Sequence, residues 1–237
     1  MTMTVGLVMH RRLFGSNCSA TRNPRNHPGQ LQDWKHSDFF FNEELKMSKR
    51  IPLPNPESLP QDIREIVEAH PLNVILMMAN VPASFKAIME LADSILFKSE
   101  FNPRKREIAV LRTAHVTGNI YEFTHHGALS KSHGVTDEEI NTIKTEDPVL
   151  SLGDEDNLIC RVADEISRNV RLSDEAFAEI LSCYGVRGAT ELITCVSYYN
   201  FLGRFLVSTG VELEDSSVLS LLHKDPQNIS KIVAGDQ

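Results

Sequence analysis

The sequence predicts an all-α fold of about eight helices. Apolar side chains recur at helical spacing in most segments between residues 58 and 209. No alternating run of apolar and polar residues, the pattern typical of strands, survives between the turn signals. With 237 residues, of which 41% are hydrophobic, the chain is long enough to bury one sizeable core and still leave an N-terminal extension.

Residues 1–50 differ in composition from the rest of the chain. They carry several arginines and no acidic residue before Asp33, and Asn, Pro, Gly and Ser are frequent. We expect a disordered extension, then a helical domain at residues 51–215 and a loosely held tail at residues 216–237. Two origins of the extension stay open. Its composition is compatible with an organellar transit peptide, and the simpler interpretation is that the protein naturally starts at Met47.

The first three helices are expected at residues 58–70, 72–79 and 81–98. The first has apolar residues on one side and stops before Pro71, because the residue before a proline disfavours the helical conformation. The second is apolar at nearly every position, so we expect it to be buried. The third begins with a Val-Pro step, and proline is favoured at the first position of a helix.

Helix signals are clearest in the middle of the chain. Asn102, followed by a proline, opens one helix, and Gly118 ends it. Asn119 opens the second helix, which runs towards His133 and stops at the glycine that follows. The sequence TDEE, which starts at Thr136, is a capping box for a third, short helix.

The C-terminal half adds helices at residues 154–169, 174–184 and 188–209. Ser173 caps the second of them and Gly185 stops it. The third is long and strongly apolar. The inward-facing residues of the second are expected to be Phe177, Ile180 and Leu181.

Asn119, Glu122 and His126 lie three and four residues apart on one predicted helix, so they share a face. A carboxylate one turn before an imidazole raises the imidazole pKa and orients the ring, which makes a natural proton-transfer pair. Glu107, on the preceding helix, can join this pair if the two helices pack antiparallel. The other interpretation of Glu122 and His126 is a solvated surface pair.

The whole segment resembles the carboxymuconolactone decarboxylase and alkylhydroperoxidase-D (AhpD) superfamily. The resemblance rests on the pattern R-E-(x)3-L, a Gly-Asn break, Y-E-(x)3-H and then G-V-(x)2-E-E-I. The matching residues are Arg106, Glu107, Leu111, Tyr121, Glu122, His126, Gly134, Glu138, Glu139 and Ile140. The resemblance extends weakly from Pro52 to Glu214. It implies an AhpD-like helical fold and assembly into a homo-oligomer, a trimer or a hexamer.

The chain departs from the peroxide-reducing branch of this superfamily. In that branch a C-x-x-C pair occupies the positions that are Asn119 and Glu122 here. Without a thiolate there is no sulfenic acid and no disulfide step. Glu107 resembles that branch more than the dedicated decarboxylases. The resemblance therefore implies the fold without the thiol chemistry.

With thiol chemistry disfavoured, acid–base chemistry is the reaction type that the residues of this segment can support. Decarboxylation of a carboxymuconolactone-type substrate leaves an enolate that must be reprotonated, and a positioned imidazolium suits that step. The resemblance implies that His126 is the proton donor, Glu122 its orienting partner and Glu107 a relay. We expect no metal and no cofactor. The residues expected to bind the substrate carboxylate or line its pocket are Asn119, Arg104, Arg106, Arg112, Tyr199 and Arg204.

The composition limits the classes of molecule with which the protein is expected to interact. The net charge of −8 and the lack of a basic stripe argue against nucleic acid, and no apolar run approaches the length of a membrane span. Cys160, Cys183 and Cys195 fall in apolar helical patterns, which favours buried free thiols in a reducing compartment, the cytoplasm.

The main hypothesis is therefore a cofactor-free decarboxylase acting on a small carboxylated substrate. Two alternatives stay open. One is a hydroperoxide reductase, which the missing C-x-x-C disfavours. The other is a non-catalytic helical oligomer that has kept the fold.

Overall fold

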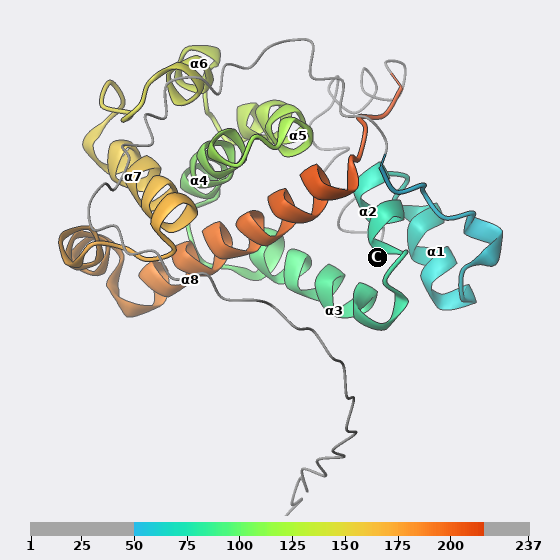
Figure 1. The fold of residues 1–237 in the computed structure, drawn as a ribbon. Coiled ribbons are helices and arrows are strands. Elements are labelled where there is room, and N and C mark those ends of the chain that lie inside the picture. Colours follow the sequence, from blue (N-terminus) through green and yellow to red (C-terminus); the bar gives the residue numbers. More distant parts are fainter. Residues whose placement is uncertain (1–49, 216–237) are drawn as a thin grey trace, which may run out of the picture. The chain divides into compact units, whose positions relative to one another are not determined.

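The computed structural model describes residues 50–215, and all of them lie in one compact unit of the chain, Glu44–Gln237. These residues form eight α-helices and no strand, which confirms the all-α prediction (Figure 1). The predictions for residues 1–49 and 216–237 lie outside the described residues. The helices are α1 (Gln61–Ala69), α2 (Asn73–Met78), α3 (Pro82–Asp93), α4 (Pro103–Val116), α5 (Ile120–Ser132), α6 (Asp137–Thr145), α7 (Asp154–Asn169) and α8 (Asp174–Thr209).

Two shorter helical turns complete the described part. Pro56–Ser58 is a 3-10 turn (η1), and Ser94–Lys98 is a π-helical turn (η2) that continues α3. The helix predicted over residues 81–98 therefore changes its winding before it ends. No helix in residues 50–215 is long and apolar enough to cross a membrane.

The capping residues act as the sequence predicts. The side chain of Asn102 accepts a hydrogen bond from the backbone N–H of Lys105, at 3.2 Å, at the start of α4. Asn119 does the same for Glu122 at the start of α5, also at 3.2 Å. Thr136 forms both hydrogen bonds of the capping box. These contacts satisfy N–H groups that a helix leaves without partners at its start.

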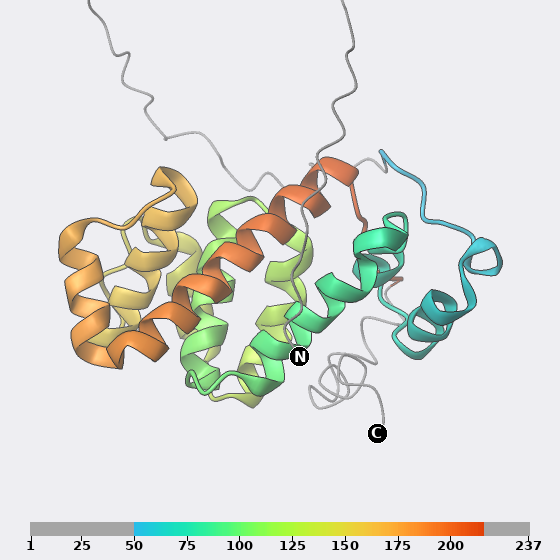
Figure 2. The same ribbon diagram turned by 90° about the horizontal axis from the view of Figure 1, so that it is seen from below.

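α8 consists of two helical parts joined at Gly185. This residue has φ 64° and ψ −177°, a backbone conformation that only glycine adopts readily. The break falls at the residue predicted to stop the helix over residues 174–184. Figure 2 shows the two parts of α8 running in different directions.

α4 is the central helix of the domain. It packs against α5, α7 and α8, and Figure 1 shows it between α5 and α7. Every residue from Arg106 to Ala114 is buried. The charged side chains within this stretch are therefore enclosed by other helices, so each of them needs a partner of opposite charge.

The first part of α8 differs from the prediction. Ile180 is buried, but Phe177 and Leu181 are 47% and 37% exposed, and Cys183 is also exposed. The predictions that these three side chains are buried were wrong. Ile180 belongs to the same core cluster as Leu158 and Val162 of α7, so one narrow stripe of this part of the helix is covered. Cys160 and Cys195 are buried free thiols, as predicted.

Candidate active site

The packing of α4 against α5 brings Glu107, Glu122 and His126 together. Nδ1 of His126 lies 2.6 Å from Oε2 of Glu107, and its Nε2 lies 3.2 Å from Oε2 of Glu122. Glu122 and His126 are one turn apart on α5, so the helix itself sets their spacing. Glu107 reaches them from α4, because the chain reverses at Gly118, which has φ +66°.

These residues are buried, and their charges support one another. Glu107 is 0% exposed and His126 is 7% exposed. Burial lowers the pKa of His126, but the charge and hydrogen bond of Glu107, with Glu122, raise it to about 9. Burial raises the pKa of Glu107, but His126 and Arg106 bring it below its ordinary value. The imidazole is therefore protonated and Glu107 ionised at neutral pH.

Arg106 completes the charge balance of Glu107. Its guanidinium lies 3.2 Å from Oε1 of Glu107 and also donates to the carbonyl oxygen of Leu96 on η2, at 2.9 Å. Each carboxylate oxygen of Glu107 thus faces one cation, Arg106 or His126. A buried carboxylate with two charge-assisted contacts is held firmly in place.

Tyr199 approaches the same imidazole from α8. Its hydroxyl oxygen lies 3.1 Å from Nε2 of His126, and the two rings meet edge to face with centroids 5.0 Å apart. Burial, and then the charge of Glu122, raise the pKa of Tyr199 well above its ordinary value, so the hydroxyl keeps its proton. Cys195 lies in the same helix, and burial raises the pKa of its thiol to about 12. It is therefore not a thiolate at neutral pH.

The sequence suggested Arg112 as a substrate-binding residue, but the structure gives it other partners. It is fully buried and makes two hydrogen bonds to Asp164, at 2.6 and 2.9 Å. It also donates to the carbonyl oxygens of Ile143 and Glu146, both at 2.8 Å. These contacts join α4 to α7 and to the end of α6.

Arg104 and Arg204 also have partners away from the Glu107–His126 pair. Arg104 forms ion pairs with Glu139 and Asp156, at 2.5 and 2.7 Å. Arg204 donates to the backbone and side-chain oxygens of Asn200, one turn earlier on α8. Of the four arginines suggested by the sequence, Arg106 contacts the cluster.

Asn119 caps α5 through its side-chain oxygen and is fully buried. Its side-chain nitrogen has no hydrogen-bond partner within the described residues. The substrate-binding role predicted for Asn119 stays a prediction. Within residues 50–215, no three His, Cys, Asp or Glu side chains are placed to hold a metal ion.

A second buried acid, Glu214, was missed by the sequence argument, which placed it at the end of the domain. Its carboxylate accepts a hydrogen bond from the hydroxyl of Tyr121 and lies 2.8 Å from Nε2 of His125. It also accepts from the backbone N–H of Asn73 at the start of α2, at 2.8 Å. Tyr121 and His125 are one turn apart, but no local pattern indicates their distant acid. Glu214 therefore joins α5 to the start of α2.

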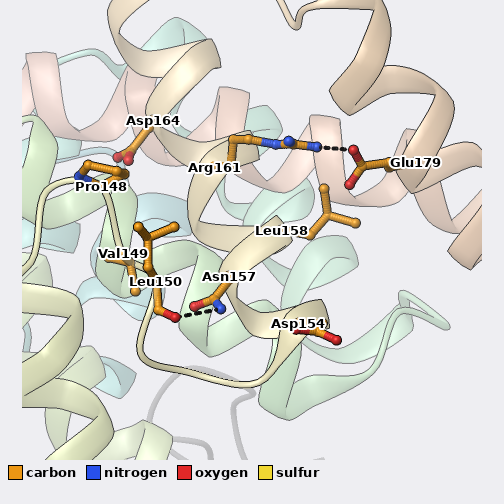
Figure 3. Close-up of a pocket in the computed structure, with 9 residues that line it drawn as sticks. All are labelled: Pro148, Val149, Leu150, Asp154, Asn157, Leu158, Arg161, Asp164 and Glu179. Carbon is orange, nitrogen blue, oxygen red and sulfur yellow. Dashed lines mark hydrogen bonds and ion pairs between the residues drawn. The ribbon is translucent and has the colours of Figure 1, made fainter.

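The structure also has a hollow of about 210 Å³ beside α7, shown in Figure 3. Arg161 and Glu179 form an ion pair at its edge, at 2.7 Å, and Asn157 donates to the backbone of Leu150. None of the residues suggested by the sequence as catalytic or substrate-binding lines this hollow.

Comparison with known proteins identifies the same segment and the same fold. Residues 82–155 match the model of the Carboxymuconolactone decarboxylase family. The structure resembles an uncharacterized peroxidase-related protein from Ralstonia eutropha JMP134, described as an alkylhydroperoxidase AhpD core. The TM-score is 0.63 at 20% identity, over 75% of this chain and 97% of that one.

A second similar structure is an uncharacterized peroxidase-related protein from Silicibacter sp. TM1040. Its TM-score is 0.61 at 15% identity, over 70% of this chain and 92% of that one. No curated protein sequence matches the chain. At these identities the two structures show the fold alone.

Proposed function

Because residues 82–155 match the Carboxymuconolactone decarboxylase family and the fold resembles that of an AhpD core, we propose that this chain is a proton-transfer enzyme. The reaction is the decarboxylation, without a cofactor, of a small lactone or ring-derived carboxylic acid. The observation that carries the proposal is the buried pairing of His126 with Glu107, at 2.6 Å, beside Glu122 and Tyr199.

The two ring nitrogens of His126 have different surroundings. Nδ1 donates to Glu107, which is fully buried and held by Arg106. Nε2 faces Glu122 and Tyr199 at longer distances, 3.2 and 3.1 Å. Nε2 is therefore the nitrogen that delivers a proton to the substrate.

The bond between the substrate and its carboxyl carbon breaks, carbon dioxide leaves, and the electron pair stays on the substrate as an enolate. Nε2–H of His126 gives its proton to the enolate carbon, and the neutral imidazole then regains a proton from water through Glu122. General acid catalysis of this kind accelerates a reaction by roughly a hundred- to ten-thousand-fold.

The distances favour a different division of roles from the one expected from the sequence. Glu107 has the shorter contact and the deeper burial, so we assign it the orienting role. Glu122 lies at the nitrogen that reacts, so we assign it the relay. Both acids stay in the proposed catalytic group with His126.

The peroxidase alternative has less support. The two similar structures are described as peroxidase-related, but by its resemblance to the superfamily this chain has Asn119 and Glu122 where the peroxide-reducing branch has its redox thiols. The pKa of Cys195 is raised to about 12, which works against a reactive thiolate.

The test is turnover of carboxymuconolactone and related small lactone carboxylic acids, followed as release of carbon dioxide. His126→Ala should abolish it, whereas Glu138→Gln, which removes an exposed carboxylate on α6, should not change it. Substrate-like acids should also raise the melting temperature, because a ligand that binds only the folded state stabilises it. Wild-type turnover in a folded His126→Ala variant would refute the mechanism. Hydroperoxide consumption with a dithiol, lost on replacing the cysteines, would favour the alternative.

A further inference from the structure

The two acids of the cluster are held very differently. Glu107 is fully buried and contacts Arg106 through one oxygen and His126 through the other. The side chain of Glu122 is 6% exposed, and within residues 50–215 its carboxylate makes one ion pair, with Nε2 of His126 at 3.2 Å. Glu122 is therefore the acid that can leave its position at the lower cost.

Two groups that can donate a hydrogen bond lie side by side at the edge of the imidazole that faces Glu122. Nε2–H of the His126 imidazolium is one of them. The other is the hydroxyl of Tyr199, which lies 3.1 Å from the same nitrogen and belongs to a residue that is only 3% exposed. Within residues 50–215 the hydroxyl contacts this nitrogen and not the carboxylate of Glu122. Once Glu122 has left, both groups can donate to one anionic oxygen, because charge-assisted hydrogen bonds are strong where water is excluded.

The charges of the cluster limit what else can enter it. Arg106 and His126 supply two positive charges, and Glu107 and Glu122 supply two negative ones. A substrate anion added beside Glu122 would place two carboxylates at one imidazolium, and like charges at that distance repel. A substrate anion and Glu122 therefore compete for one place.

We propose that Nε2 of His126 and the hydroxyl of Tyr199 form an anion subsite for an anionic oxygen of the substrate, which displaces Glu122, the partner of Nε2 in the resting protein. The inference rests on the proposed function, since it places the reacting end of a carboxylic acid at Nε2. It gives Glu122 a further role as a specificity-determining residue: a ligand without a negative charge does not replace it.

Acetate is the probe, because it carries the anionic group and cannot react. Its dissociation constant is measured by titration calorimetry on the full chain, together with the His126 ring resonances in NMR spectra. Removing the competing charge in Glu122→Ala should tighten acetate binding by about tenfold or more. Glu122→Gln removes the charge but keeps the bulk, so it should tighten binding by a smaller factor. Glu138→Gln, which removes an exposed charge on α6, should stay within about twofold of the unmodified protein.

A double variant tests the second donor. Adding Tyr199→Phe to Glu122→Ala should cancel a large part of the gain in acetate affinity. The proposal is overturned if Glu122→Ala and Glu122→Gln bind acetate no more tightly than Glu138→Gln. It is equally overturned if the gain survives in full without the Tyr199 hydroxyl. Acetate binding does not require turnover, so a gain in affinity in a protein that decarboxylates nothing would refute the proposed function and leave the subsite standing.

Discussion

At the scale of single residues, the site depends on a buried carboxylate that forms ion pairs with two cations. Glu107 has no contact with solvent and joins Arg106 to His126. Breaking a buried pair by removing one partner leaves the other charge buried without compensation, and that costs more than the pair itself contributes. The same residue therefore determines both the charge of the imidazole and part of the stability of the domain.

The substitution Glu107→Gln should show both effects. It should lower the free energy of unfolding by roughly 3–5 kcal/mol, because Arg106 and His126 lose their common partner. It should also lower the pKa of His126, measured by NMR titration of the ring. Glu122→Gln serves as the comparison, and its effect on stability should be smaller, because that contact is longer and Glu122 is less deeply buried than Glu107. Equal losses of stability in the two variants would contradict this ranking of the acids.

The pH dependence of stability follows from the same pair. The pKa of His126 is raised from 6.5 to about 9 in the folded protein. The folded state then binds more protons than the unfolded state between these values, so stability falls as pH rises through this window. The contribution is fully present below pH 6.5. Urea unfolding at a series of pH values measures it, and the slope between about pH 6.5 and 9 should largely disappear in His126→Asn. An unchanged slope in that variant would assign it to another group.

At the scale of elements, the ends of the helices are the most predictable part of the fold. The caps at Asn102, Asn119 and Thr136 are local, so a few neighbouring residues determine them. The break at Gly185 was predictable for the same reason. The grouping of Glu122 with His126 follows from their spacing on one helix.

Contacts between distant residues could not be predicted in the same way. Arg112 and Asp164 are 52 residues apart in the sequence, and no pattern in the residues around either one indicates that they form a pair. An arginine that is fully buried as a tie between helices looks, in the sequence, like an arginine free to bind a carboxylate. The exposure of Phe177 and Leu181 has a related cause, because a helix pattern shows an apolar face but not how many neighbours cover it.

The end of α7 offers a test at this scale. Val170, the residue that follows the helix, has φ 68° and is 86% exposed. A branched side chain is strained in this left-handed conformation, whereas glycine adopts it readily. Val170→Gly should therefore raise the free energy of unfolding by about 1 kcal/mol, measured by urea denaturation.

The control is Val186→Gly, at another exposed valine, 74% accessible and located inside α8. There glycine should destabilise the protein by about a few tenths of a kcal/mol, because it is a poorer helix former than valine. If Val170→Gly also lowers the free energy of unfolding, the backbone strain at the end of α7 contributes too little to offset the entropic cost of glycine, and the prediction is wrong.

At the scale of the whole molecule, the chain leaves large apolar side chains in contact with solvent. Phe97 on η2 is 42% exposed and Phe201 on α8 is 45% exposed, and these two elements are in contact. Phe201 also stacks on Phe205, with ring centroids 6.3 Å apart. Exposed aromatic groups of this kind are typical of surfaces that another protein covers.

We therefore predict a homo-oligomer, a trimer or a hexamer, that buries Phe201. Light scattering at micromolar concentration should give a multiple of the mass of one chain, and Phe201→Glu should reduce it by placing a charge in the interface. Leu150→Glu is the matched control, because Leu150 is 70% exposed but lies in the loop before α7. The mass of a single chain in the unmodified protein would contradict the prediction.

The anchor of Glu214 has a consequence for how the protein is made. Its carboxylate contacts Asn73, 141 residues earlier in the sequence, and His125, 89 residues earlier. During synthesis a chain emerges from its N-terminus, so α2 and α5 leave the ribosome long before their common partner does. Closing so long a loop is one of the late and slow events of folding. The helix that carries His126 therefore gains its contact with Glu214 only after the chain has been synthesised as far as that residue.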